Sequence, residues 1–246
     1  MNYVYLSFPS LPSTNDYLKD HYSTLASGTV VSTKHQTKGK GRLGRIWVDD
    51  DGSLLFSFLL KEEGLERLLH LLPLIAGASI EKMLLEEGID AKIKWPNDIF
   101  INDKKCCGVL VEGISDSSLK AVVVGIGINL NNESFLSELD SATSLYRESG
   151  KRYEKKDVMQ KILKYFDEFL NLEKHGTSVY YPLLKEYDYL KGKKILLNYY
   201  GENRLVTALE ISKNGALMVK DENEKTIMVT AGEATIIKTN RSSLEQ

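Results

Sequence analysis

Apolar and β-branched residues gather in short runs along the first sixty positions. Residues 3–8 (YVYLSF), 28–36 (GTVVSTKHQ) and 54–61 (LLFSFLLK) each have the length and composition of a strand. After the first run, Ser13 precedes Asp16 by three positions, which is the start signal of a capped helix. The pattern therefore predicts strand, helix, strand and strand in chain order.

The middle of the chain changes from a helical to a strand pattern. Between 65 and 87, leucine and isoleucine recur at helical spacing, and Gly88 supplies a stop. We place Pro73 in the first turn of the long helix, after a short helical segment. The strand-like runs that follow are joined by short connections, one of them an Asn102–Asp103 turn typical of a hairpin, which indicates an antiparallel or mixed sheet. These runs are 91–95, 98–101, 106–114 and 119–131.

The last third divides into a helical part and a strand-rich part. Residues 155–176 form an amphipathic helical pattern, and a shorter helical stretch runs to about Tyr189. From Lys191 onward, five short strand-like runs are separated by turns with Gly, Asn or Asp, which predicts a small five-stranded barrel. We therefore expect one domain over 1–189, a second over 190–238, and a disordered tail over 239–246.

Composition and charge narrow the class of protein. The 246 residues are 42% hydrophobic and 27% charged, which is ordinary for a globular chain, and the net charge of −2 argues against general binding to nucleic acid or membrane surfaces. The N-terminus lacks a signal-peptide pattern, and no run approaches 18 apolar residues. Cys106 and Cys107 are adjacent, so we expect buried, reduced thiols and a cytoplasmic location.

Residues 37–47 (TKGKGRLGRIW) concentrate glycine and positive charge without any acid. Glycine permits left-handed backbone and close approach to a ligand, and successive amides in such a loop can cradle an anion. The pattern therefore favours a loop that binds a phosphate or carboxylate. A solvated basic loop without a ligand remains the alternative. Its glycines are Gly39, Gly41 and Gly44, and its cations are Lys38, Lys40, Arg42 and Arg45.

The spacing Gly39, Gly41 and Gly44 matches the dinucleotide fingerprint G-x-G-x-x-G literally. That motif also requires a helix to begin inside the loop, because the helix N-terminus holds the pyrophosphate. Here the loop is followed by a turn and a strand, so the dinucleotide interpretation is disfavoured. Neither a P-loop nor the later motifs of a protein kinase occur in the sequence.

Three further motifs lie in the strand region. In 94–98 (KWPND), the proline interrupts strand pairing and leaves polar side chains at a rim, although a simple turn explains it equally well. Lys105 stands at the entrance of an apolar strand, where lysine usually protects an edge. In 125–129 (GIGIN), interior glycines mark close approach by a ligand or another backbone.

Taken in order, these motifs resemble those of the biotin protein ligases. The family pattern is an STN segment, a GRGRxGRxW loop, KWPND, a K-x-x-G-[IV]-L-x-E strand and a G-I-G-x-N strand, and the matching segments here begin at Ser13, Gln36, Lys94, Lys105 and Gly125. The resemblance covers residues 1 to 238. It implies an α+β fold with a mixed, largely antiparallel sheet flanked by helices, like that of class II synthetases, followed by a small SH3-like barrel.

The resemblance also implies a two-step reaction and a role for each matching residue. Biotin's carboxylate would attack the α-phosphate of Mg·ATP, and a lysine of a biotin carboxyl carrier domain would then displace AMP from biotinyl-5′-AMP. Arg42, Lys105 and Asp98 would be catalytic; Asp98 would either hold Mg²⁺ or accept the acceptor lysine's proton, which stays open. Biotin would contact Ser13, Thr14, Asn15, Gln36, Gly39, Lys40, Gly41, Arg42, Lys105, Gly108 and Gly127. ATP would contact Arg42, Arg45, Trp47, Lys94, Asn97 and Asn129.

One residue departs from the family pattern, and some alternatives remain. Lys40 replaces an arginine, and a lysine cannot make arginine's two-pronged contact, so we expect Arg42 to be the main anchor. Because the STN segment begins at residue 13, we expect no DNA-binding domain and no DNA partner. Charge and the lack of a long apolar run predict no membrane partner, and the resemblance implies a homodimer, since some family members associate through the central sheet. A lipoate–protein ligase and a non-catalytic binding module are the competing hypotheses.

Overall fold

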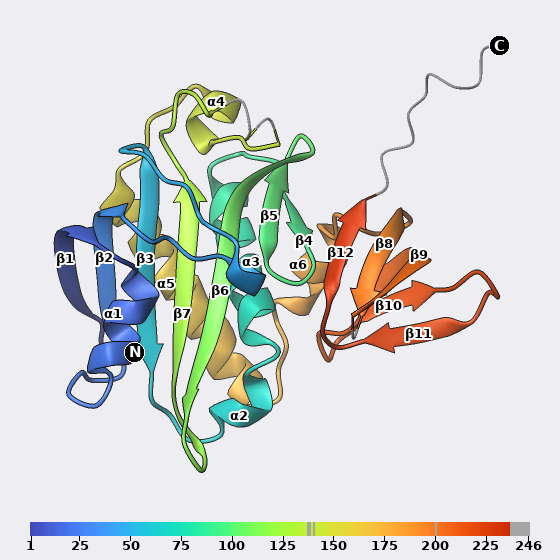
Figure 1. The fold of residues 1–246 in the computed structure, drawn as a ribbon, viewed down its shortest axis with the longest axis horizontal. Coiled ribbons are helices and arrows are strands. Elements are labelled where there is room, and N and C mark those ends of the chain that lie inside the picture. The colour runs from blue at the N-terminus through green and yellow to red at the C-terminus, as the bar shows by residue number, and fades with distance from the viewer. Residues whose placement is uncertain (137–138, 140, 200, 237–246) are drawn as a thin grey trace.

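The strands form two separate sheets, one from the first half of the chain and one from its C-terminal part (Figure 1). The computed structural model describes residues 1–136, 139, 141–199 and 201–236. The larger sheet has seven strands in the order β1-β2-β3-β7-β6-β5-β4. Strands β1 and β2 are parallel and the other neighbours are antiparallel, so the mixed sheet that the sequence predicts is confirmed. The strands are β1 (Val4–Leu11), β2 (Thr29–Gln36), β3 (Ser53–Leu60), β4 (Lys92–Lys94), β5 (Asp98–Ile101), β6 (Lys104–Ser115) and β7 (Leu119–Asn129).

Helices cover both faces of this sheet, which explains why its central strands are apolar throughout. All eight residues of β3 are buried. Helix α1 (Thr14–His21) packs on β2, β3 and β7, whereas α3 (Leu72–Glu86) and α5 (Lys155–Lys174) pack on each other and on the opposite face (Figure 1). Ser13 caps α1 as predicted, because its hydroxyl accepts from the Asp16 amide at 3.4 Å.

Two local sequence signals lead to the expected backbone. A short helix α2 (Leu65–Leu68) precedes α3, and Pro73 lies in the first turn of α3. Asn102 and Asp103 both have positive φ, of 48° and 61°, as the tight turn between β5 and β6 requires. Helix α4 (Leu145–Ser149) was not predicted from the sequence, although Ser144 caps its start and Gly150 ends it in left-handed conformation.

The smaller sheet contains the five strands that were predicted, in the order β11-β10-β9-β8-β12. The predicted barrel is not closed, because within residues 201–236 no ladder joins β11 to β12; β12 has four residues and pairs with β8. The fold is therefore an open, SH3-like sheet. Its strands are β8 (Lys194–Tyr199), β9 (Glu202–Ile211), β10 (Leu217–Lys220), β11 (Thr226–Val229) and β12 (Glu233–Ile236).

The two sheets are joined by a backbone connection and by buried contacts. Helix α6 (Tyr181–Glu186) leads into a segment that hydrogen-bonds along the edge strand β4: Ile93 donates to Tyr187, and Tyr189 donates to Ile93. The Trp95 indole donates to the Gly215 carbonyl at 3.0 Å. The domain boundary near residue 190 stays a prediction, and the predicted disorder of 239–246 lies outside the described residues.

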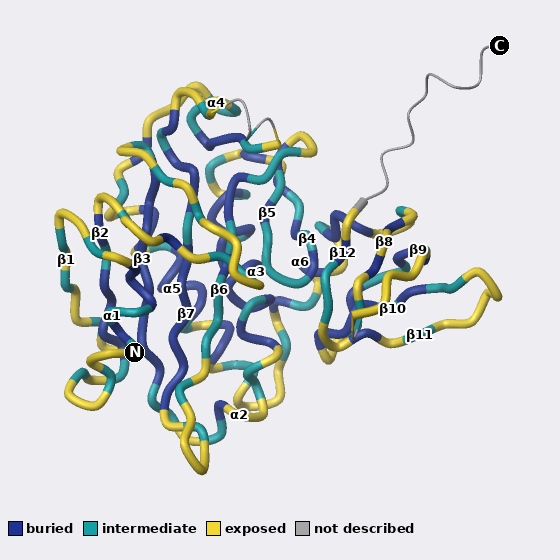
Figure 2. Tube along the Cα trace, in the orientation of Figure 1, coloured by how far each residue is buried: buried dark blue, intermediate teal, exposed yellow. Residues whose placement is uncertain are grey.

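Buried residues form a continuous core between the large sheet and helices α3 and α5, and the core extends into the small sheet (Figure 2). A second cluster lies under α1 and includes Leu18, Val31 and Val123. Both predicted thiols, Cys106 and Cys107, are free and fully buried. In the described part of the chain, no helix is both long enough and apolar enough to cross a membrane.

Candidate active site

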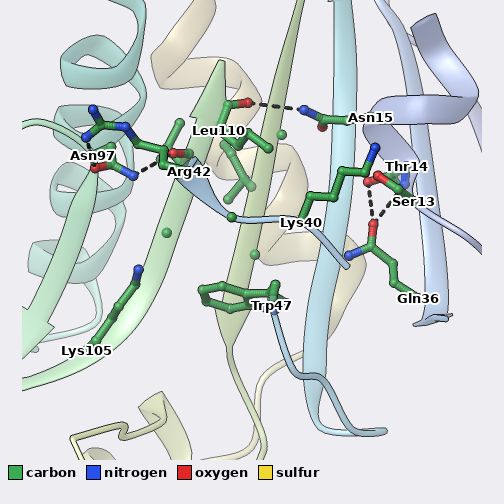
Figure 3. A pocket seen from close by; sticks show the side chains of 16 residues that line it. Ser13, Thr14, Asn15, Gln36, Lys40, Arg42, Trp47, Asn97, Lys105 and Leu110 are labelled. Carbon is green, nitrogen blue, oxygen red and sulfur yellow. Dashed lines mark hydrogen bonds between the residues drawn. The ribbon is translucent and has the colours of Figure 1, made fainter. Parts of the chain in front are cut away.

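A cavity lies on the α1 side of the large sheet, between α1, the glycine–cation loop and the central strands (Figure 3). It brings together segments that are far apart in the sequence. Twelve of the predicted site residues line it: Ser13, Thr14, Asn15, Gln36, Lys40, Gly41, Arg42, Trp47, Asn97, Lys105, Gly108 and Gly127.

One end of the cavity is neutral and rich in hydrogen bonds. The Gln36 side-chain carbonyl accepts from the Thr14 amide at 2.8 Å and lies 3.1 Å from the Thr14 hydroxyl. Ser13, Thr14 and Asn15 are all buried, because they form the first turn of α1, which is pressed against the sheet. This end can recognise an uncharged polar group.

Two residues of this polar end were not predicted from the sequence. Ser57 is fully buried on β3 and contacts Thr14 and Asn15, and Glu112 on β6 accepts from the Asn15 amide at 2.7 Å. A serine within an apolar strand is a usable signal, because a buried hydroxyl needs a partner. Nothing in the sequence around Glu112, apart from its place in the VLVE segment, indicated that it would belong to the site.

The glycine–cation loop folds differently from the expected cradle of amides. The amides of Gly41, Arg45 and Trp47 donate to carbonyls within the loop itself, so they do not point together at a ligand. Gly44 has a positive φ of 74°, but Gly39 and Gly41 do not. The backbone bonds close the loop into a tight turn, which leaves anion binding to its side chains.

Gly39 nevertheless needs to be glycine, for a steric reason. A Cβ at this position would lie 2.4 Å from the Trp47 carbonyl oxygen, because the Trp47 amide donates to the Gly39 carbonyl and holds the two segments together. Leu43 takes the positive φ that was expected only of the glycines, at 54°, and its side chain is exposed. Gly39 is therefore required by close approach to Trp47, and Gly44 by its left-handed backbone conformation.

Three cations of the loop have partners outside the loop. Lys40 pairs with Asp16 of α1 at 2.7 Å, Arg42 donates to the Asn97 side chain at 3.1 Å, and Arg45 pairs with Glu233 at 2.6 Å. Arg42 also donates to the Gly232 carbonyl at 3.1 Å, so the small sheet reaches the loop. Lys38 is exposed and does not line the cavity.

Trp47 lies on a floor made by two paired glycines. Gly108 on β6 and Gly127 on β7 face each other in register, and a Cβ at Gly127 would come within 2.7 Å of the indole. The Lys105 ammonium is 5.5 Å from the ring centroid. The glycines therefore make room for a flat aromatic wall beside a positive charge (Figure 3).

A second cavity adjoins the first and is strongly charged. Its lining includes Arg42, Arg45, Lys94 and Lys105 together with the carboxylates Asp98 and Glu233. Lys105 and Asp98 form an ion pair at 2.7 Å. Burial lowers the pKa of Lys94, and an anionic ligand in this cavity would oppose that shift by favouring the charged form. The cavity is suited to a polyphosphate.

Asn129 lies apart from these two cavities. It lines a third cavity with Trp47 and Lys105, and its amide donates to the Thr143 carbonyl at 3.0 Å. Trp47 and Lys105 line all three cavities, so the predicted nucleotide residues surround one aromatic ring. Among the described residues, no group of three or more His, Cys, Asp or Glu side chains is placed to hold a metal.

Comparison with known proteins identifies the family. Residues 7–129 match the model of the biotin/lipoate A/B protein ligase family. The chain belongs to this family. The match contains the complete first cavity and most of the second, so the family region and the candidate site coincide.

Individual relatives extend the similarity beyond that region. The bifunctional ligase/repressor BirA of Bacillus spizizenii is 33% identical over 207 residues, which cover 79% of this chain and 62% of the relative. The chain thus spans about three fifths of that protein's length. The biotin–[acetyl-CoA-carboxylase] ligase of Paracoccus denitrificans is 36% identical over 110 residues, 43% of this chain and 46% of the relative.

A solved structure matches over nearly the whole chain. The biotin protein ligase of Aquifex aeolicus, in complex with biotin and ATP, has a TM-score of 0.85 and 32% identity, covering 96% of this chain and 99% of that one. The predicted fold class, with its second C-terminal sheet, is confirmed by this likeness. The family membership that the motifs predicted is confirmed as well.

Proposed function

We propose that the protein is a biotin–protein ligase, which uses ATP to join biotin to a lysine of a biotin carboxyl carrier domain. The observation that carries this proposal is a single cavity with a neutral hydrogen-bonding end at Thr14 and Gln36 and a cationic end at Arg42 and Lys105. Biotin has the same two ends, a cyclic urea and a carboxylate. The adjoining charged cavity supplies a place for ATP.

In the first step, a carboxylate oxygen of biotin attacks the α-phosphorus of ATP and pyrophosphate leaves, which gives biotinyl-5′-AMP. Both reactants are anions, so their approach requires positive charge. Arg42 and Lys105 lie where the two cavities meet, and they would neutralise the carboxylate and the α-phosphate as charge develops. Arg45 and Lys94 would bind the outer phosphates that leave.

In the second step, the lysine amine of the carrier attacks the acyl carbon of the adenylate and AMP leaves. The amine must first lose a proton, and Asp98 is a carboxylate of the second cavity, next to Lys105, that would accept it. The substrate form of ATP carries Mg²⁺, which neutralises phosphate charge. Asp98 offers an oxygen ligand of the type that Mg²⁺ prefers; its Oδ1 is buried and pairs with Lys105 at 2.7 Å.

Trp47 and the glycines would shape the nucleotide site. The indole presents a flat apolar face above Gly108 and Gly127, which is suitable for stacking with adenine. Asn97 and Asn129 would supply hydrogen bonds to the nucleotide. Lys40 would bind the carboxylate end of biotin after exchanging its partner Asp16 for the ligand.

The polar end of the cavity favours biotin over lipoate. Lipoate has a dithiolane ring in place of a urea, so it would leave buried hydrogen-bonding groups around Thr14 and Asn15 without partners. The cations of the second cavity also disfavour a non-catalytic module, because a module of that kind has no need to collect four of them in one place.

Mass spectrometry tests the proposed function directly. The purified protein is mixed with Mg·ATP, biotin and a biotin carboxyl carrier domain, and the carrier is expected to gain the mass of one biotinyl group. The gain is expected to vanish when the acceptor lysine is changed to arginine. A gain with lipoate on a lipoyl domain but none with biotin would assign the chain to the lipoate branch, and no gain with either would reject the ligase proposal.

We also propose a cytoplasmic setting and a homodimer. The two buried, reduced cysteines fit a reducing compartment. Strand β1 is an edge of the large sheet with Val4 and Tyr5 exposed, which provides a surface for a second copy. Light scattering at several protein concentrations would measure the mass of the assembly.

A further inference from the structure

A continuous set of hydrogen bonds runs behind the polar end of the cavity. It begins at Glu112 on β6, passes through Asn15 on α1 and Ser57 on β3, and ends at Thr14. The successive distances are 2.7 Å from Asn15 Nδ2 to Glu112 Oε2, 2.5 Å from Ser57 Oγ to Asn15 Oδ1, and 2.7 Å between Ser57 Oγ and Thr14 Oγ1. Figure 3 shows Asn15 and Thr14 at neighbouring positions on this wall.

Glu112 fixes the orientation of the Asn15 amide. A carboxylate only accepts hydrogen bonds, so the side of the amide that faces it has to be the NH₂ group. The Leu110 carbonyl, 3.4 Å from the same nitrogen, also accepts only. Asn15 Oδ1 is therefore turned toward Ser57, and Ser57 donates its one hydroxyl hydrogen to it.

The direction of the Asn15–Ser57 bond then determines what Thr14 can offer. Because the Ser57 hydrogen is committed to Asn15, the 2.7 Å contact between the two hydroxyls requires Thr14 to donate. The other neighbour of the Thr14 hydroxyl, Gln36 Oε1 at 3.1 Å, is also an acceptor. The single Thr14 hydrogen is thus held within the protein, and Thr14 Oγ1 presents only acceptor lone pairs to a ligand.

Gln36 has the complementary role. Its Oε1 accepts from the Thr14 backbone amide at 2.8 Å, and a backbone amide only donates. This contact leaves the Nε2 group of Gln36 as the ligand-facing donor. The wall thus offers an acceptor and a donor side by side, which is the complement of an N–H group next to a carbonyl.

Glu112 is itself held in place by charges on α1. Its second oxygen, Oε1, pairs with Lys19 at 2.6 Å, and Lys19 also pairs with Asp16 at 3.0 Å. Asp16 in turn pairs with Lys40 of the loop. The positions of the two Glu112 oxygens are therefore determined by one lysine and one amide.

We propose that Glu112 is a specificity-determining positioning residue: acting through Asn15 and Ser57, it makes Thr14 an obligatory acceptor for a ureido N–H of the substrate. This inference rests on the proposed function and names the part of the ligand that the wall recognises. A ligand without an N–H at this position would face a buried acceptor that has no partner, which disfavours its binding.

The test is a charge exchange measured by calorimetry of biotin binding without ATP. Glu112→Gln lets the Asn15 amide turn over, and Asn15→Asp places two carboxylates against each other, so each change is expected to weaken binding at least about tenfold. In the double variant, the introduced glutamine amide donates to the introduced aspartate, and Ser57 still donates to the same carboxylate. The direction of the chain is restored, and affinity is expected to return to within about threefold of wild type.

Controls separate this role from a general loss of structure. Glu87→Gln removes the same charge from a carboxylate paired with Lys161 at the end of α3, and it is expected to leave biotin affinity unchanged. Ser57→Ala interrupts the chain without changing charge and is expected to weaken biotin binding, whereas the KM for ATP stays constant in all four variants. Melting temperatures establish that each variant is folded.

The outcomes distinguish the inference from the proposed function. If wild-type protein fails to bind biotin, the ligase proposal itself is wrong. If wild-type protein binds biotin but Glu112→Gln binds it within about threefold of wild type, the ligase proposal stands and the inference is overturned. A double variant that is as weak as the two single changes combined would also overturn it, because the restored chain would then have no effect.

Discussion

Charged side chains at the site are held by specific partners, and each partner defines what a ligand must displace. Lys40 faces Asp16, Lys105 faces Asp98, and Arg42 faces the neutral acceptors Asn97 and Gly232. Arg42 is thus the cation at this junction whose described partners are uncharged. An anion would not have to compete with a carboxylate for it, which supports its assignment as the main anchor.

Arg42→Ala is accordingly expected to lower the rate of pyrophosphate release at least about tenfold, or to release biotinyl-AMP into solution, because the positive charge between the two anions is lost. The measurement is a pyrophosphate assay combined with chromatography of free biotinyl-AMP. Arg67→Ala, on α2 away from the site, serves as the control. A normal product yield with the intermediate tightly retained would contradict the assignment.

A second prediction concerns the buried Glu81 on α3. Its side chain is fully buried, and burial raises its pKa to about 8, which nearby Lys92 only partly opposes. The folded state therefore favours the protonated form, so stability is lost as pH rises from the carboxyl's ordinary range near 4.5 through about 8. Glu81→Gln removes this dependence.

Denaturant unfolding of wild type and Glu81→Gln at pH 5 and pH 8 checks this expectation. The free energy of unfolding of the variant is expected to gain about 1–3 kcal/mol relative to wild type between the two pH values. An equal difference at both pH values would show that the carboxyl does not titrate in this range. Glu87→Gln, at the more exposed end of the same helix, controls for the change of charge.

At the scale of the element, the paired glycines of β6 and β7 control the position of Trp47. Gly127→Ala would place a Cβ 2.7 Å from the indole, so the ring has to move. We expect the KM for ATP to rise about tenfold, since the aromatic wall of the nucleotide site is displaced. Gly77→Ala on α3 is the matched control, because its Cβ would meet Ile93 at an ordinary 3.6 Å.

Tryptophan emission gives an independent measurement for this prediction. The protein has two tryptophans, and Trp95 is buried and hydrogen-bonded to Gly215 on the far side of the KWPND turn. A change in emission for Gly127→Ala therefore reports on Trp47. Unchanged emission together with an unchanged KM would mean that Trp47 does not depend on this floor.

At the scale of the whole molecule, the small sheet contributes to the site through Gly232 and Glu233. Glu233→Ala frees Arg45 from its partner across the second cavity. We expect the KM for ATP to fall about two- to fivefold, which is the range that an exposed ion pair supports, because the phosphates no longer compete with a carboxylate for Arg45; biotin affinity should not change. The experiment is steady-state kinetics together with biotin calorimetry.

The control for this prediction is another contact between the same two parts of the chain. Lys185 on α6 and Glu210 on β9 form an ion pair at 3.6 Å away from the cavities, so Glu210→Ala should leave the KM for ATP unchanged. If both variants change the KM for ATP equally, the effect comes from loosened packing between the sheets. If neither does, Glu233 has no part in holding Arg45.

Local patterns in the sequence determined the kind and order of most elements. Alternation, helical spacing and turn residues act over a few positions, so the Pro73 helix start, the Asn102–Asp103 turn and the five C-terminal strands were all readable. The motifs also identified which residues would gather at one site. Helix α4 was missed because its five residues are too few to show a period.

Tertiary structure decided what those residues contact. The partners Lys40–Asp16, Arg45–Glu233 and Asn15–Glu112 are separated by between 24 and 188 positions, and no local pattern encodes such pairs. The loop amides turned inward because backbone bonds across a tight turn use them, and the small sheet stayed open because β12 pairs with β8. The sequence thus determined which chemical groups are available at the site. Packing determined which of them pair and which donate or accept, because hydrogen bonds depend on geometry that only the folded chain supplies.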